Sequence, residues 1–243
     1  MHDDIVFKSV IIFTTSLFVA GLMGGMFPLF SNLKERGLHS LLALGTGMLL
    51  GTIFLHMLPD SMSEQGFPLF VLMGLMTVFV VEKLVFGQNQ PGTHSLIGLT
   101  AFFGLSIHAV IAGISFSFLL DKPYIPIALF SSLLLHKLSE TFSLASVFLL
   151  AGYSKRKSIK LIFVFSLFTP ISVLLGLVLI RTVASNYIGA AAAIATGTFL
   201  YVAIVDLLPE VFHHKKGQWW NLTALLLGIA IIATIIGSSG HAH

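Results

Sequence analysis

The chain has 243 residues, of which 56% are hydrophobic and only 9% are charged. Soluble domains carry about 25% charged residues, so this composition excludes a water-soluble fold. The formal net charge of +3 gives no reason to expect a nucleic-acid partner, and the absence of cysteine excludes disulfides and thiolate metal ligands.

Eight apolar segments alternate with short polar breaks, and each is long enough to cross about 30 Å of hydrocarbon as a helix. We expect the first segment to be retained as a span, because no basic region or cleavage site precedes it. The sequence therefore predicts an all-α membrane protein with eight transmembrane helices in a single domain over residues 1–243. The predicted spans are about 5–30, 39–60, 67–86, 93–119, 124–151, 158–180, 187–212 and 219–237.

Lysine and arginine are unevenly distributed between the two sets of alternate breaks. Three lie in one set, namely Lys8, Lys122 and Arg181. Nine lie in the other, namely Lys34, Arg36, Lys83, Lys155, Arg156, Lys157, Lys160, Lys215 and Lys216. Basic loops favour the cytoplasmic side of a membrane. We therefore expect both termini to lie outside the cytoplasm, with the protein in the cell (inner) membrane.

A short internal repeat relates the second and seventh segments. Residues 45–60, GTGMLLGTIFLHMLPD, align without gaps on residues 195–210, ATGTFLYVAIVDLLPE. These segments cross in opposite directions in an eight-span chain, so an inverted repeat relating spans 1–3 to spans 6–8 is predicted. Inverted repeats are typical of secondary transporters, whose sites lie near the bilayer midplane. The alternative is a helix-breaking motif that arose twice by chance.

Ionisable side chains occur inside the fourth and fifth segments, although each costs about 2.5–3.5 kcal/mol at the bilayer centre. His136 and Glu140 lie four residues apart, hence on one helical face, as two ligands of one zinc ion would. A hydrogen-bonded pair between helices is the alternative. His108 lies about as far before the break at 121–123 as His136 lies after it. An antiparallel hairpin would bring the two histidines to the same depth.

The second and seventh segments carry further candidates. His56 precedes the Leu-Pro-Asp ending of the second segment, and its counterpart in the repeat is Asp206. Acidic and histidine side chains near the span ends could gather cations or pass them on, although solvated helix ends are the alternative. These pathway candidates are Asp60 and Glu64 at the outer end and Asp206, Glu210 and His213 at the inner end.

The span count, the outside termini and three motifs together resemble the ZIP family of metal transporters (zinc/iron permease-like). The motifs are an HKxxE type sequence at His136 to Glu140, a histidine five residues before glycine at His108 and Gly113, and His-x-x-Pro at His56 and Pro59. The resemblance implies a bundle of three, two and three helices that passes a metal ion by alternating exposure. It also implies that the main transport site falls on His56, His108, His136 and Glu140.

The chain departs from the family pattern beside this site. Members with two adjacent metals have an acidic residue after the first fifth-span ligand, whereas this chain has Lys137. A protonated lysine cannot ligate and would repel a second dication. We therefore predict that Lys137 replaces a second metal site and that the centre is mononuclear. Ala109 and Ala112 stand where the family often has asparagine and an acidic residue, which we expect to change metal preference or rate.

Three imidazoles and one carboxylate suit zinc, with Fe²⁺, Mn²⁺, Co²⁺ and Cd²⁺ as alternatives. The sequence therefore predicts a divalent metal transporter, rather than an enzyme, that moves zinc towards the cytoplasm. An intramembrane zinc-dependent hydrolase is the rival function, but no HExxH motif occurs. The expected partners are divalent metal ions and the lipid bilayer. The sequence leaves both a monomer and a homodimer open.

Overall fold

The computed structural model describes residues 2–31, 34–62, 65–86, 94–120, 127–179, 188–213 and 217–238, which are helical apart from short turns. Two π-helical segments, η1 and η3, interrupt helices that continue on either side. The elements are α1 His2–Phe30, α2 Glu35–Thr52, η1 Ile53–Met57, α3 Leu58–Ser61, α4 Phe67–Phe86, α5 His94–Leu120, α6 Ile127–Leu150, α7 Lys155–Leu179, α8 Ile188–Tyr201, η3 Val202–Leu207, α9 Leu208–Val211 and α10 Gln218–Ser238.

Counting α2–η1–α3 and α8–η3–α9 as single rods, the described residues form eight helices. Seven of them are long and apolar enough to cross a membrane, while the apolar part described for α5 is the shorter stretch Gly98–Ile114. The prediction of an all-helical membrane protein is thus confirmed. Three helices begin three or four residues before the predicted spans, namely the first at His2, the second at Glu35 and the sixth at Lys155. A helix continues through polar residues at the membrane surface, where the apolar pattern has already ended.

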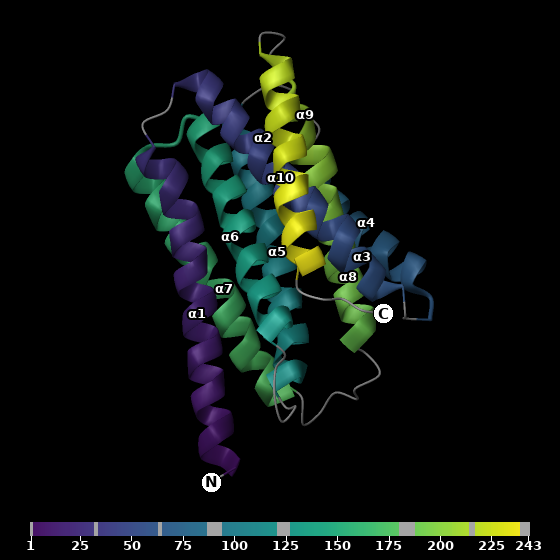
Figure 1. Ribbon diagram of the computed structural model, residues 1–243. Helices are drawn as coiled ribbons and strands as arrows, with labels where there is room; N and C mark the ends of the chain where they lie inside the picture. Colours follow the sequence, from purple (N-terminus) through teal and green to yellow (C-terminus); the bar gives the residue numbers. More distant parts are fainter. Residues whose placement is uncertain are drawn as a thin grey trace.

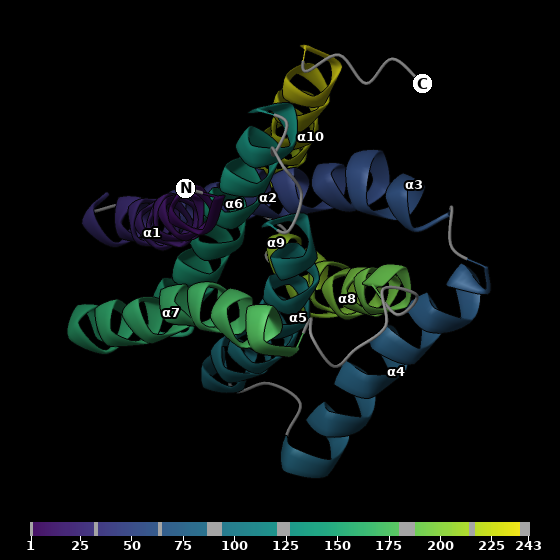
Figure 2. The same cartoon turned by 90° about the horizontal axis from the view of Figure 1, so that it is seen from below.

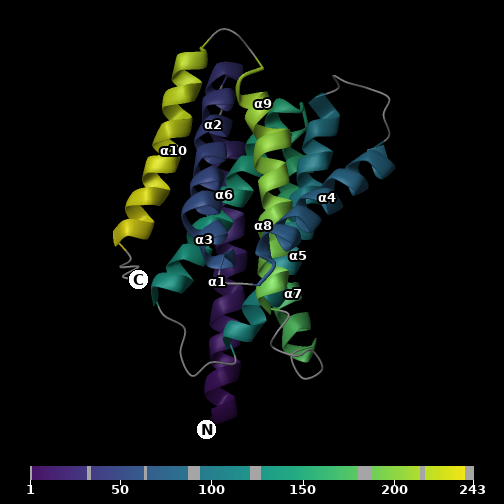
Figure 3. The ribbon, with the colours of Figure 1, turned by 90° about the vertical axis from the view of Figure 1, so that its right-hand side faces the viewer.

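The helices form two groups, which Figure 2 shows on opposite sides of the molecule. The first group contains α1, α5, α6 and α7, with α1 lying along α6 and α5 along α7. The second group contains α2–η1–α3, α4, α8–η3–α9 and α10, with α2 along α10 and α4 along α8 (Figure 3). The groups meet where α5 contacts α8 and where α2 contacts α6.

The described chain starts and finishes towards the same end of the bundle. In Figure 1, α1 begins at the lower end, and α10 runs down from the upper end. This arrangement agrees with an even number of crossings. Which of the two ends faces the cytoplasm stays a prediction.

The two stretches that align in sequence also have matching structural features. Gly47 of α2 lies against the Leu225 carbonyl of α10, and Gly197 of α8 lies against the Val71 carbonyl of α4, so a side chain at either glycine would overlap backbone. Glycine allows helices in a membrane to approach this closely. Each π segment ends directly before the Leu-Pro pair of its stretch. The inverted repeat and the 3+2+3 arrangement themselves stay predictions.

A short turn fixes the junction between α6 and α7. Gly152 has a φ of 73°, which glycine adopts without steric cost. The Tyr153 amide donates to the Phe148 carbonyl and the Gly152 amide to the Leu149 carbonyl, as in a Schellman motif. The Tyr153 ring stacks on Phe148 with 5.3 Å between centroids. This turn holds the end of α6, the helix that carries His136 and Glu140, close to α7.

Candidate metal site

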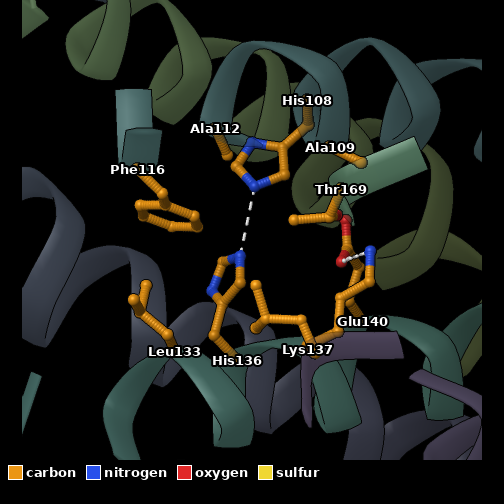
Figure 4. A pocket seen from close by; sticks show the side chains of 10 residues that line it. His108, Ala109, Ala112, Phe116, Leu133, His136, Lys137, Glu140 and Thr169 are labelled. Atoms are coloured by element: carbon orange, nitrogen blue, oxygen red, sulfur yellow. Dashed lines mark hydrogen bonds and ion pairs between the residues drawn. The ribbon is translucent and has the colours of Figure 1, made fainter. Parts of the chain in front are cut away.

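Two histidines from neighbouring helices of the first group face each other in the interior. His108 of α5 and His136 of α6 are both buried. Their Nε2 atoms lie 3.1 Å apart, as Figure 4 shows. The expectation that an antiparallel hairpin brings these two side chains to the same depth is confirmed.

A backbone carbonyl of the second group orients His108. The Nδ1 atom of His108 lies 2.8 Å from the carbonyl oxygen of Ala195 in α8. Because a carbonyl only accepts, Nδ1–H donates this hydrogen bond, and in the neutral ring Nε2 keeps its lone pair. His136 then donates Nε2–H to His108. An Nδ1–H to carbonyl hydrogen bond is the support that metal-binding histidines commonly have.

Phe199 of α8 covers both imidazoles. Its ring stacks on His108 with 4.2 Å between centroids and an interplanar angle of 14°, and it lies 4.9 Å from the centroid of His136. The sequence reasoning did not find Phe199 or the Ala195 carbonyl. The sequence feature that could have pointed to them is that both lie in the stretch 195–210, which repeats residues 45–60. Apolar cover on this side keeps the facing nitrogens away from other polar groups.

Glu140 lies in the same pocket but is paired with Lys137. The Lys137 ammonium donates to Glu140 Oε2 at 2.8 Å, and the two side chains are only 2% and 1% exposed. Within the described chain, Glu140 Oε1 has no hydrogen-bond partner. The ammonium also lies 4.2 Å from the centroid of the Phe165 ring. The pocket is lined by Leu17, His108, Ala109, Ala112, Phe116, Leu133, His136, Lys137, Glu140 and Thr169.

His56 lies in η1 of the second group and faces Asp60. Its Nδ1 atom is 3.1 Å from Asp60 Oδ2, and the Asp60 side chain is 58% exposed. The described residues contain no group of three or more His, Asp or Glu side chains arranged to hold a metal ion. The four predicted ligands are therefore not assembled around one point, and the four-ligand site stays a prediction.

The other pathway candidates are spread along the bundle. Glu64 lies outside the described residues. Glu210 in α9 is buried, whereas His213 follows α9 and is exposed. Asp206 lies in η3, which directly follows Tyr201. Glu82, which the sequence reasoning missed, accepts a 2.6 Å hydrogen bond from the hydroxyl of Tyr201. A transport role for these side chains stays a prediction.

Known proteins match this chain over nearly its whole length. Zinc transporter ZIP9 of Xenopus tropicalis is 25% identical over 99% of this chain and 100% of that protein. Zinc transporter ZIP13 of Pongo abelii is 27% identical over 88% of this chain and 74% of that protein. Fe(2+) transport protein 1 of Arabidopsis thaliana is 26% identical over 87% of this chain and 80% of that protein.

The family described as ZIP Zinc transporter matches residues 7–95 and 87–236. These ranges include all four predicted ligands. Members of this family are transporters of divalent metal ions and not enzymes, so the hydrolase alternative is set aside. The earlier resemblance is confirmed, and the chain belongs to the ZIP family of zinc transporters.

Proposed function

We propose that this chain carries zinc across the membrane through one mononuclear site formed by His56, His108, His136 and Glu140. The ion moves towards the cytoplasm by alternating access. The observation that supports this proposal best is the contact between the Nε2 atoms of His108 and His136 in a buried pocket.

The separation of the two imidazoles suits a shared ion. Zinc binds histidine nitrogen at about 2.0–2.1 Å in tetrahedral geometry, which separates two ligand nitrogens by about 3.3 Å. The Nε2 atoms lie 3.1 Å apart without an ion. A zinc ion can therefore be held by both rings after a small movement. For both Nε2 atoms to ligate as neutral imidazoles, His136 must carry its proton on Nδ1 instead of Nε2.

Completing the site requires two side chains to change partners. Glu140 must turn from Lys137 to the ion, and His56 must turn from Asp60. Three neutral imidazoles and one carboxylate would leave a bound dication with net charge +1. Such a site binds an ion but can still release it, as transport requires. Lys137 beside it opposes a second dication, which supports a single-ion site.

The position of the pocket supports alternating access. His108, His136 and Glu140 belong to the first group of helices, while His56 belongs to the second group. The Ala195 carbonyl and the Phe199 ring reach the histidines from across the boundary. Movement of one group against the other would change which side the pocket opens to, as in other transporters with sites at a repeat interface.

Radioactive zinc flux into liposomes tests the proposal. We expect the purified chain to carry zinc, and we expect His108→Ala and His136→Ala to reduce the flux at least about 100-fold, because each removes a ligand. His39→Ala serves as the matched control, since His39 is also buried but lies near the start of α2. Unchanged flux in His136→Ala would exclude this site. Absence of flux in the unmodified chain would exclude zinc transport itself, and direct measurement of Fe²⁺ flux would then test the alternative ion.

A further inference from the structure

Lys137 is a buried cation whose surroundings extend beyond the metal pocket. Its ammonium is bound to Glu140 on one side and lies over the Phe165 ring of α7 on the other. A buried ammonium without a partner is costly, so each position that it occupies needs a polar group nearby. In this structure Glu140 is that group. If Glu140 turns to a metal ion, Lys137 needs another partner.

Ser166 of α7 can supply one. Its side chain is fully buried, and its hydroxyl has no hydrogen-bond partner among the described residues. Ser139 and Ser146 of α6, by contrast, donate to carbonyls one turn earlier in their helix. Buried hydroxyls in proteins are normally hydrogen-bonded. Ser166 therefore has a free acceptor site in the interior of the first group.

The two side chains both lie next to Gly21 of α1. A Cβ atom placed on Gly21 would lie 2.8 Å from the Ser166 hydroxyl oxygen and 3.5 Å from Cε of Lys137. Because residue 21 is glycine, no side chain at this position stands between them. The lysine chain has several rotatable bonds, so its ammonium can turn from Glu140 towards Ser166.

We propose that Lys137 is a tethered cation that competes with the metal ion for Glu140, and that Ser166 accepts its ammonium while metal is bound. This proposal rests on the proposed function, because it requires Glu140 to be a ligand. In the empty site Lys137 neutralises Glu140. When a dication arrives, charge repulsion and loss of the carboxylate both drive the ammonium towards Ser166. When the ion leaves, Lys137 returns, so the buried carboxylate is always paired and the ion is released more readily.

Zinc titration of the full chain in detergent, together with zinc flux in liposomes, tests the proposal. We expect Ser166→Ala to raise the zinc Kd about tenfold, because the displaced ammonium loses its acceptor. Ser158→Ala is the matched control, since Ser158 lies on the same helix and is equally buried with an unpartnered hydroxyl. Lys137→Gln removes the charge but can still donate to Glu140. We expect it to lower the zinc Kd about tenfold and to slow the flux.

The double variant separates this role from a structural one. In the Lys137→Gln background, Ser166→Ala should not change the Kd further, because no ammonium needs an acceptor. The proposal fails if Ser166→Ala changes the Kd no more than Ser158→Ala does, or if its effect is the same in both backgrounds. Should Lys137→Gln not fold, the comparison of the two serine variants decides alone. If every variant binds zinc as the unmodified chain does, only the lysine proposal is refuted. If the unmodified chain itself binds no zinc, the proposed function is refuted and this proposal with it.

Discussion

Removing only one member of the Lys137–Glu140 pair should destabilise the fold strongly. The two groups are 2.8 Å apart and almost completely buried, so neither is compensated by water. Breaking a buried ion pair from one side typically costs about 3–5 kcal/mol, whereas replacing both members by apolar side chains is often neutral. We expect Glu140→Met to lose about 3–5 kcal/mol, which for a chain of this size lowers the Tm by about 6–20 °C. The double variant Lys137→Met/Glu140→Met should recover most of this loss.

Thermal unfolding in detergent with a metal chelator measures these differences without a contribution from bound zinc. Lys83→Met is the control, because Lys83 is 47% exposed and lies 3.5 Å from Glu82. An exposed pair of this kind contributes at most about 1 kcal/mol, so its Tm should change little. Two results would refute the reasoning: a Glu140→Met chain as stable as the unmodified one, or a double variant as unstable as Glu140→Met.

Three further outcomes are expected. Gly47→Ala should force α2 away from the Leu225 carbonyl and lower the free energy of unfolding by about 1–3 kcal/mol, measured by thermal unfolding. Gly237→Ala should be nearly neutral, because a Cβ atom at position 237 would have no neighbour within 4 Å. Phe199→Ala should remove the ring that covers both histidines, destabilise the chain by about 3–5 kcal/mol, and weaken zinc binding in a titration. Because the chain has no cysteine, Lys157→Cys provides one thiol, which a membrane-impermeant reagent should label only from the cytoplasmic side; labelling from outside would contradict the predicted orientation.

The sequence could predict the helices and the meeting of His108 with His136, because both follow from fixed helix geometry. The length of an apolar segment determines whether it can cross a membrane. The rise per residue then determines the depth of a side chain on a hairpin. The equal spacing of His108 and His136 from the break at 121–123 was therefore enough to predict that their imidazoles meet. The ends of the helices were less predictable, since α2 and α7 continue into polar residues beyond the apolar pattern.

The partners of these side chains could not be predicted from the sequence. In a soluble protein, a polar face shows how each helix is rotated, but these helices are apolar nearly all round. The sequence alone could not show that Phe199 and the Ala195 carbonyl face His108, or that Lys137 and Ser166 both lie next to Gly21. The spacing of three residues between Lys137 and Glu140 permits their ion pair. The choice between that pair and a metal ligand depends on neighbouring helices.

Each of the two π segments carries one of the candidate polar residues. His56 lies in η1 and Asp206 in η3, and each segment directly precedes a Leu-Pro pair. Proline cannot donate to the residue one turn earlier and clashes with its carbonyl in a regular α-helix, and a π segment changes this pairing. The same local sequence thus widens two helices at equivalent points. The first of these points lies beside Asp60, and the second directly follows Tyr201, whose hydroxyl donates to Glu82 of α4. Under the proposed function, an ion that leaves the central pair towards Asp206 would reach the part of the bundle where Glu82 of α4 supplies a second carboxylate.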